Sequence, residues 1–132
     1  MKVLIVSRQF PAYHPKAGQS TRFVENILSG IKKHTLRENK TGKFKNGDTV
    51  SLRYWSDKPY CSKQIEFAQA KIKVESLDIK AKGNVSLIFL ADNDGLSSSD
   101  FVEWFGGLEK ASKWKGSCIW FNNIKPTKET TK

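Results

Sequence analysis

One short stretch concentrates side chains that can bind or react with a polar ligand. Residues 30–37 read Gly-Ile-Lys-Lys-His-Thr-Leu-Arg, which places Lys32, His34, Thr35 and Arg37 within six residues. Lysine attracts anions, threonine supplies a hydroxyl that bonds or reacts, and the arginine guanidinium forks onto a phosphate or a carbonyl. We therefore take this stretch as a candidate site for an anionic or polar planar ligand. The alternative, a strand edge that happens to be basic, stays open because short motifs often arise by chance.

A helix must deliver the chain to this stretch. Ser20 or Thr21 can cap a helix that runs to about Ser29, because apolar residues recur along one side at helical spacing. That stripe consists of Phe23, Val24, Ile27, Leu28 and Ile31. Gly30 is the expected end of the helix, since glycine accepts the left-handed conformation that follows many helices.

The geometry after the helix decides whether the side chains meet. If residues 34–37 are extended, Thr35 and Arg37 point to the same face of the strand. Lys32 is three residues from Thr35, so in a straight strand the two would point apart. The sequence therefore predicts a bend at residues 31–33 if these side chains form one site.

The rest of the chain alternates between strand and helix signals. Strands are predicted at residues 3–6, 49–55, 64–74, 85–90 and 117–121, and a second helix begins at residues 97–99. The apolar phase of the third strand shifts between Phe67 and Ala68, which indicates a β-bulge. This order fits an α+β fold or a small closed β-barrel with helical connections. We expect one domain over residues 1–121 and a polar, lysine-containing tail over residues 122–132.

The charge is strongly basic and uneven. The formal net charge is +10 over 132 residues. Residues 31–46 carry six basic and one acidic residue, and residues 110–132 carry the same numbers, whereas residues 75–109 carry seven acidic and two basic residues. Such asymmetry indicates a basic face that attracts phosphates, although many small basic domains bind no nucleic acid.

Other patterns argue against several classes of function. Cys61 and Cys118 form no Cys-x-x-Cys motif, and His14 and His34 complete no metal-ligand spacing. We therefore expect free thiols, with a single disulfide as the open alternative, and no metal or cofactor. No apolar run approaches the roughly 20 residues that span a bilayer. The first residues lack the apolar core of a signal peptide. We therefore expect a cytoplasmic protein that does not bind a membrane.

Two segments together resemble a known family. The segment Ile27-Leu-Ser-Gly-Ile-Lys-Lys-His-Thr-Leu-Arg37 is followed by a turn, Asn46-Gly-Asp48. This combination resembles the ASCH domain family of the PUA-like superfamily, which shares an Ile-Leu-x-Gly-x-Lys-x-x-(Glu or Thr)-x-Arg segment and a later Gly-Asp turn. A helix near Ser97 after an acidic turn also matches, so the resemblance covers roughly residues 20–121. It implies an α+β, PUA-like β-barrel with two main helices and a cleft that holds RNA or a nucleoside.

One branch of that family is a small amidohydrolase that deacetylates N4-acetylcytidine through a Gly-x-Lys-x-x-Thr-x-Arg motif and a downstream carboxylate. The resemblance implies that Lys32 deprotonates Thr35, which attacks the acyl carbon. Burial near Arg37 would lower the pKa of the lysine as such a base requires. The downstream carboxylate matches Asp94, where the amidohydrolase has a glutamate.

Two other functions stay open beside catalysis. A non-catalytic binder of RNA or nucleosides would stack bases on Trp55 and Tyr60, with Tyr13 as a further candidate. Its polar contacts would come from four basic residues, Lys16, Lys32, Arg37 and Lys58. A protein-interaction module built on exposed aromatic residues is the third possibility, and its candidates are Trp104, Trp114 and Trp120.

Overall fold

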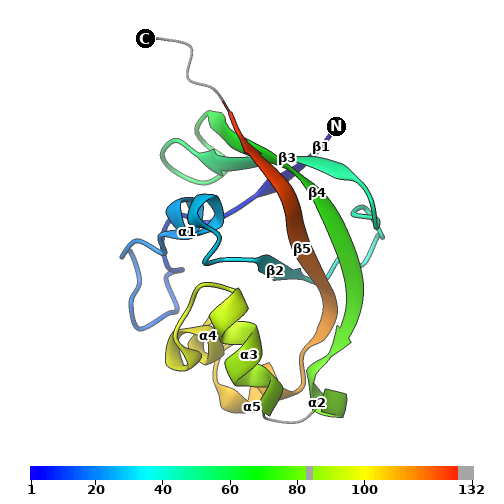
Figure 1. The fold of residues 1–132 in the computed structure, drawn as a ribbon. Helices are drawn as coiled ribbons and strands as arrows, with labels where there is room; N and C mark the ends of the chain where they lie inside the picture. The colour runs from blue at the N-terminus through cyan, green and yellow to red at the C-terminus, as the bar shows by residue number, and fades with distance from the viewer. Residues whose placement is uncertain (83–84, 128–132) are drawn as a thin grey trace.

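Five strands form one curled sheet in the computed structural model, which describes residues 1–82 and 85–127 (Figure 1). The strands are β1 (Lys2–Ile5), β2 (His34–Arg37), β3 (Thr49–Trp55), β4 (Gln64–Asp78) and β5 (Lys115–Pro126). Their order is β1-β3-β4-β5-β2, with β1 parallel to β3 and every other neighbouring pair antiparallel. The sheet is a half-barrel whose two edges are β1 and β2.

The helices within the described residues number five. They are α1 (Phe23–Ser29), α2 (Ile79–Lys82), α3 (Val85–Asn93), α4 (Ser98–Trp104) and α5 (Leu108–Ser112). Helices α2 to α5 gather at one end of the sheet, whereas α1 stands apart from them and leads through a short loop into β2 (Figure 1). The sequence indicated two main helices; those correspond to α1 and α4, and the mixed α and β character is confirmed.

The predicted strand at residues 85–90 is wrong, because this segment lies in α3. The run Val-Ser-Leu-Ile-Phe-Leu is almost continuously apolar, and periodicity cannot distinguish a buried strand from a buried helix in such a run. The burial pattern is helical. Leu87, Leu90 and Ala91 are buried, whereas Ile88 and Phe89 are more than half exposed.

The long strands explain how the sheet curls. The register between β3 and β4 shifts at Leu52 and Arg53, which pair with Ala68 and Glu66 and leave Phe67 as the extra residue. The bulge predicted from the change of apolar phase is therefore confirmed. β5 is longer than predicted, because pairing with β4 continues through Pro126. Residues 122–126 thus belong to the sheet, and residues 128–132 of the predicted tail lie outside the described residues.

One hydrophobic core joins the sheet to the helices. The almost fully buried side chains come from both, and include Leu4, Ile27, Val50, Leu52, Ile72, Phe101 and Ile119. Because this core fixes α1, β2 and the end of α3 relative to one another, it also fixes the side chains that these elements carry into the site.

Candidate functional site

A cleft of about 880 Å³ lies where the half-barrel is open, between its edge strands. We call it the seam cleft. It is lined by the chain that follows β1, by β2 and by the start of the β3–β4 loop, with further side chains from the helical end. The lining comprises residues 5–13 and 35–38, Phe23, Lys32, Trp55, Asp57, Pro59, Tyr60, Asp94, Trp104, Phe105 and Trp114.

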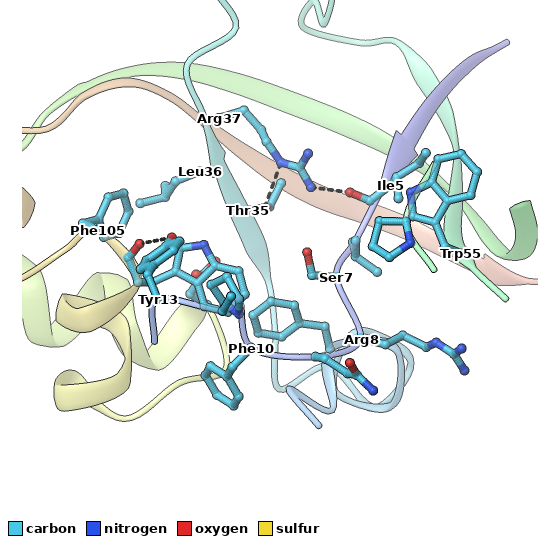
Figure 2. A pocket seen from close by; sticks show the side chains of 18 of the residues that line it. Ile5, Ser7, Arg8, Phe10, Tyr13, Thr35, Leu36, Arg37, Trp55 and Phe105 are labelled. Carbon is cyan, nitrogen blue, oxygen red and sulfur yellow. Dashed lines mark hydrogen bonds between the residues drawn. The ribbon is translucent and has the colours of Figure 1, made fainter. Parts of the chain in front are cut away.

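Arg37 bridges the opening between the edge strands β1 and β2. Its Nη2 donates to the carbonyl oxygen of Ile5, 2.6 Å away, and so links β2 to β1 where no backbone ladder does (Figure 2). Its Nε donates to the Thr35 hydroxyl over 3.4 Å, which confirms that Thr35 and Arg37 share a face. Burial lowers the pKa of Arg37, yet a guanidinium keeps its charge in proteins. The structure therefore holds a fixed, charged fork at the base of the cleft.

The chain makes the predicted bend after α1. Gly30 adopts a left-handed conformation (φ 86°) and ends the helix. The backbone N–H of Lys32 then donates to the Asn26 carbonyl, and that of Lys33 donates to the Asn93 carbonyl at the end of α3. These bonds turn Lys32 into the interior before β2 begins at His34.

Lys32 is a buried cation with a carboxylate partner. Only 1% of the residue is exposed, and its Nζ donates to Asp94 Oδ1 at 2.7 Å and to the Asp94 carbonyl at 3.0 Å. The ammonium also lies 4.0 Å from the centre of the Phe23 ring, a cation–π contact. Burial lowers the pKa of Lys32, and the charge of Asp94 offsets part of this effect. Asp94 thus reaches the lysine although its side chain is one methylene shorter than the glutamate of the resembled family.

Asp94 is held by the turn that ends α3. Its backbone N–H bonds to the Leu90 carbonyl, and the next residue, Gly95, has φ +75°. A Cβ on Gly95 would lie 3.1 Å from the Cβ of Lys32, so the turn and the lysine approach closely. Burial alone would raise the pKa of Asp94, but the Lys32 charge and a His34 hydrogen bond outweigh it and keep the pKa below its usual value.

Sequence reasoning assigned no role to His34, and the structure places it beside this pair. The side chain is fully buried, and its Nδ1 lies 3.3 Å from Asp94 Oδ1. Its only sequence signal was its place between Lys32 and Thr35. Because the partner carboxylate is 60 residues away, spacing along the chain could not reveal the contact.

Aromatic side chains stand on opposite sides of the cleft. Trp55 and Tyr60 lie on one side with ring centres 5.4 Å apart, and Tyr60 is 86% exposed. Tyr13 and Phe105 lie on the other side (Figure 2). Tyr13 is fixed there because its hydroxyl donates to the Trp104 carbonyl at 2.6 Å.

The structure separates two predicted ligand-binding residues from the cleft. Lys16 pairs with Asp100 on α4 at 2.8 Å, and neither Lys16 nor Lys58 is among the lining residues. The three other predicted binding residues, Arg37, Trp55 and Tyr60, line the cleft, as do the predicted catalytic residues, Lys32, Thr35 and Asp94.

The tryptophans considered for a protein-interaction surface have other positions. Trp104, Trp114 and Trp120 are half-buried and pack against the core, and the first two also line the cleft. Within residues 1–82 and 85–127, no cluster of His, Cys, Asp and Glu side chains is arranged to hold a metal ion. The same residues include no helix with the length and apolarity that crossing a membrane requires.

Comparison of the chain with known protein families, with curated proteins and with solved structures yields no match. The resemblance to the ASCH family therefore rests on the sequence segments that carry it, and the site must be interpreted from its own geometry.

Proposed function

We propose that the seam cleft binds a nucleobase, presented either by a free nucleoside or by an unpaired position of an RNA strand, in a PUA-like domain of the ASCH type. The observation that carries this proposal is the Arg37 guanidinium, fixed at the base of a cleft with aromatic rings on opposite sides. The half-barrel and the motif from Lys32 to Arg37 support the family assignment.

The size and walls of the cleft suit a planar ring. Its volume, about 880 Å³, lies in the range of small-molecule sites, which are mostly apolar with a few fixed polar groups. Trp55 and Tyr60 line one side with ring centres 5.4 Å apart, and Tyr13 lies on the other side, across from Trp55 (Figure 2). Stacking on such rings contributes about 1–3 kcal/mol per base.

The polar groups at the base of the cleft suit the edge of a nucleobase. A guanidinium has five N–H donors in a rigid plane, and the hydrogen bonds of Arg37 to Thr35 and Ile5 use two of them. The remaining donors match the carbonyl and ring-nitrogen acceptors of a base. The Thr35 hydroxyl adds a group that both donates and accepts hydrogen bonds.

The charge of the lining favours the base over the phosphates. The lining includes three cationic residues, Arg8, Lys32 and Arg37, and three acidic ones, Glu38, Asp57 and Asp94. Lys32 is already paired with Asp94. The cleft is therefore charge-balanced, unlike the basic face that the sequence predicts, and phosphate contacts of an RNA strand would lie outside it.

Titration with the common ribonucleosides and with short single-stranded RNA tests this proposal, with tryptophan fluorescence as the signal at low and high salt. We expect nucleoside binding that changes little with salt, because no phosphate is bound. Steeper salt dependence for RNA would show additional phosphate contacts. Arg37→Lys keeps the charge but loses the fork, so it should abolish most of the binding, whereas the exposed control Lys45→Gln should not. Failure of every nucleoside and RNA to bind would contradict the proposal.

A second candidate is an amidohydrolase that acts on an N4-acylated cytidine. The observation that favours it is the buried Lys32, which shares the cleft with Thr35 and is paired to Asp94 at 2.7 Å. A lysine whose pKa is lowered by burial can act as a base, and a threonine hydroxyl can act as a nucleophile. The described hydrogen bond of the Thr35 hydroxyl is with Arg37, so ligand binding would have to bring the hydroxyl to Lys32.

Incubation with N4-acetylcytidine, followed by chromatography of the products, tests this second function. Thr35→Val keeps the shape and removes the hydroxyl, and Lys32→Met removes the base. Acetate and cytidine should appear with the wild-type chain and with neither variant. Binding of the substrate without turnover would leave the non-catalytic function as the correct one.

A further inference from the structure

His34 occupies an unusual position for a polar side chain. It is 0% exposed, and its ring packs edge-on against Trp120 with centres 4.7 Å apart. Its Nδ1 lies 3.3 Å from Asp94 Oδ1, whereas its Nε2 has no hydrogen-bond partner among the described residues. The side chain does not line the seam cleft, although both Asp94 and Lys32 do.

These contacts define which nitrogen carries the proton. An ionised carboxylate only accepts hydrogen bonds, so Nδ1 must be the donor to Asp94. A protonated Nε2 would be a buried donor of a cation without a partner, which is far more costly than an unprotonated ring nitrogen. The geometry therefore assigns a neutral imidazole with its hydrogen on Nδ1.

One oxygen of Asp94 receives hydrogen bonds from both sides. Oδ1 accepts from Lys32 Nζ at 2.7 Å and from His34 Nδ1 at 3.3 Å. Because two donors from different positions meet on the same atom, the carboxylate cannot rotate away from Lys32 without losing the histidine bond as well. We propose that His34 is a positioning residue that holds the Asp94 carboxylate against Lys32. From outside the cleft, His34 thereby fixes the negative charge that the buried Lys32 ammonium faces.

Other titratable groups surround this cluster. The charge of Arg37, from the same strand, acts on both Lys32 and Asp94, and Cys118 on β5 acts on Lys32. Trp120 packs against the imidazole and its Nε1 donates to Glu75 at 2.8 Å, so this carboxylate is engaged by the indole. Asp94 is thus the carboxylate that contacts the imidazole directly.

Three substitutions separate positioning from packing. The amide nitrogen of asparagine can occupy the place of histidine Nδ1, so His34→Asn retains a donor to Asp94. His34→Gln places its amide near the position of Nε2 and loses that donor. His34→Leu fills the space without any donor. If only the loss of histidine packing mattered, the asparagine and glutamine variants would change the titration of Lys32 alike.

The test is an NMR titration of the Lys32 side chain, labelled with ¹³C at its ε carbon, in the ligand-free protein. The charge of Asp94 raises the pKa of Lys32. We therefore expect a lower lysine pKa in His34→Leu and His34→Gln, and a nearly wild-type titration in His34→Asn. An unchanged titration in His34→Leu, or equal shifts in the asparagine and glutamine variants, would overturn the proposal. Thermal melting of each variant verifies that it is folded.

The role of His34 in ligand binding rests on the proposed function, whereas the titration does not. If a nucleoside binds, His34→Leu should weaken its affinity about fivefold, the size of one hydrogen bond, and His34→Asn should restore it. If no nucleoside binds but the Lys32 titration shifts as expected, the positioning role stands and the proposed function fails.

Discussion

Asp94→Asn removes the charge that faces the buried ammonium and keeps the shape of the side chain. Lys32 is 1% exposed, and its Nζ lies 2.7 Å from Oδ1 of the carboxylate whose charge the substitution removes. Loss of one partner from a buried ion pair costs about 3–5 kcal/mol. The backbone carbonyl of residue 94 and the Phe23 ring still contact the ammonium, so we expect the lower value, about 3 kcal/mol. With about 2.1 cal/mol/K of unfolding entropy per residue, a chain of 132 residues would melt about 11 °C lower.

The loss of unfolding free energy in Asp94→Asn should depend on pH in a defined way. The pKa of Asp94 is lowered in the folded state, so its contribution is present above the unfolded carboxyl pKa and is lost as the pH falls through the folded value. The pKa of Lys32 is also lowered, so stability rises with pH between its folded and unfolded values as the ammonium loses its proton. In Asp94→Asn this rise begins at lower pH. The difference from wild type is therefore largest above the pH range in which Asp94 ionises and below the range in which Lys32 loses its proton, and it shrinks in acid and in base.

Urea denaturation followed by tryptophan fluorescence measures these differences. Asp92→Asn is the matched control, because Asp92 is exposed on α3, and it should change stability by less than about 0.5 kcal/mol. Lys32→Met combined with Asp94→Asn should recover part of the loss, since no unpaired charge is then buried. A cost below about 1 kcal/mol, or one that is the same at every pH, would refute the buried ion pair.

Three further substitutions test the surroundings of the site. Gly95→Ala should cost at least about 1 kcal/mol more than Gly42→Ala in urea denaturation, because both have positive φ but only at Gly95 would the new Cβ meet Lys32. Equal losses of unfolding free energy in the two variants would show that a Cβ at residue 95 does not clash with Lys32. Ser97→Ala should lower the unfolding free energy by about 1 kcal/mol, since the hydroxyl caps α4, and no change would argue against the cap. Trp55→Ala should weaken nucleoside binding by about 1–3 kcal/mol in calorimetric titration, and unaltered affinity would exclude stacking there.

Local patterns predicted two of the elements around the site well. The stripe before Gly30 indicated α1, and the strict alternation of residues 49–55 predicted β3 with its observed bounds. A bend at residues 31–33, just after the helix end, was predicted as the condition under which Lys32 and Thr35 form one site. These features depend on contacts between near neighbours, which a sequence displays directly.

The features that the sequence did not predict depend on contacts between residues that are distant along the chain. The uniform apolar run in α3 hides its helical phase until the core shows which residues are buried. A lysine is rarely buried without a partner, and the partner of Lys32 lies 62 residues away. The opening of the half-barrel between β1 and β2 is a property of the whole sheet, so the cleft that Arg37 spans has no sequence signature.

The central prediction is that a nucleobase meets Arg37 at the base of the seam cleft. An ¹H–¹⁵N NMR titration with ribonucleosides and N4-acetylcytidine observes the Nε–H group of Arg37 and the indole N–H of Trp55 directly. We predict that at least one nucleoside shifts both signals, and that both shifts reach saturation together. If no nucleoside moves either signal, or if shifts appear only at exposed residues such as Lys43 and Lys45, the account is contradicted.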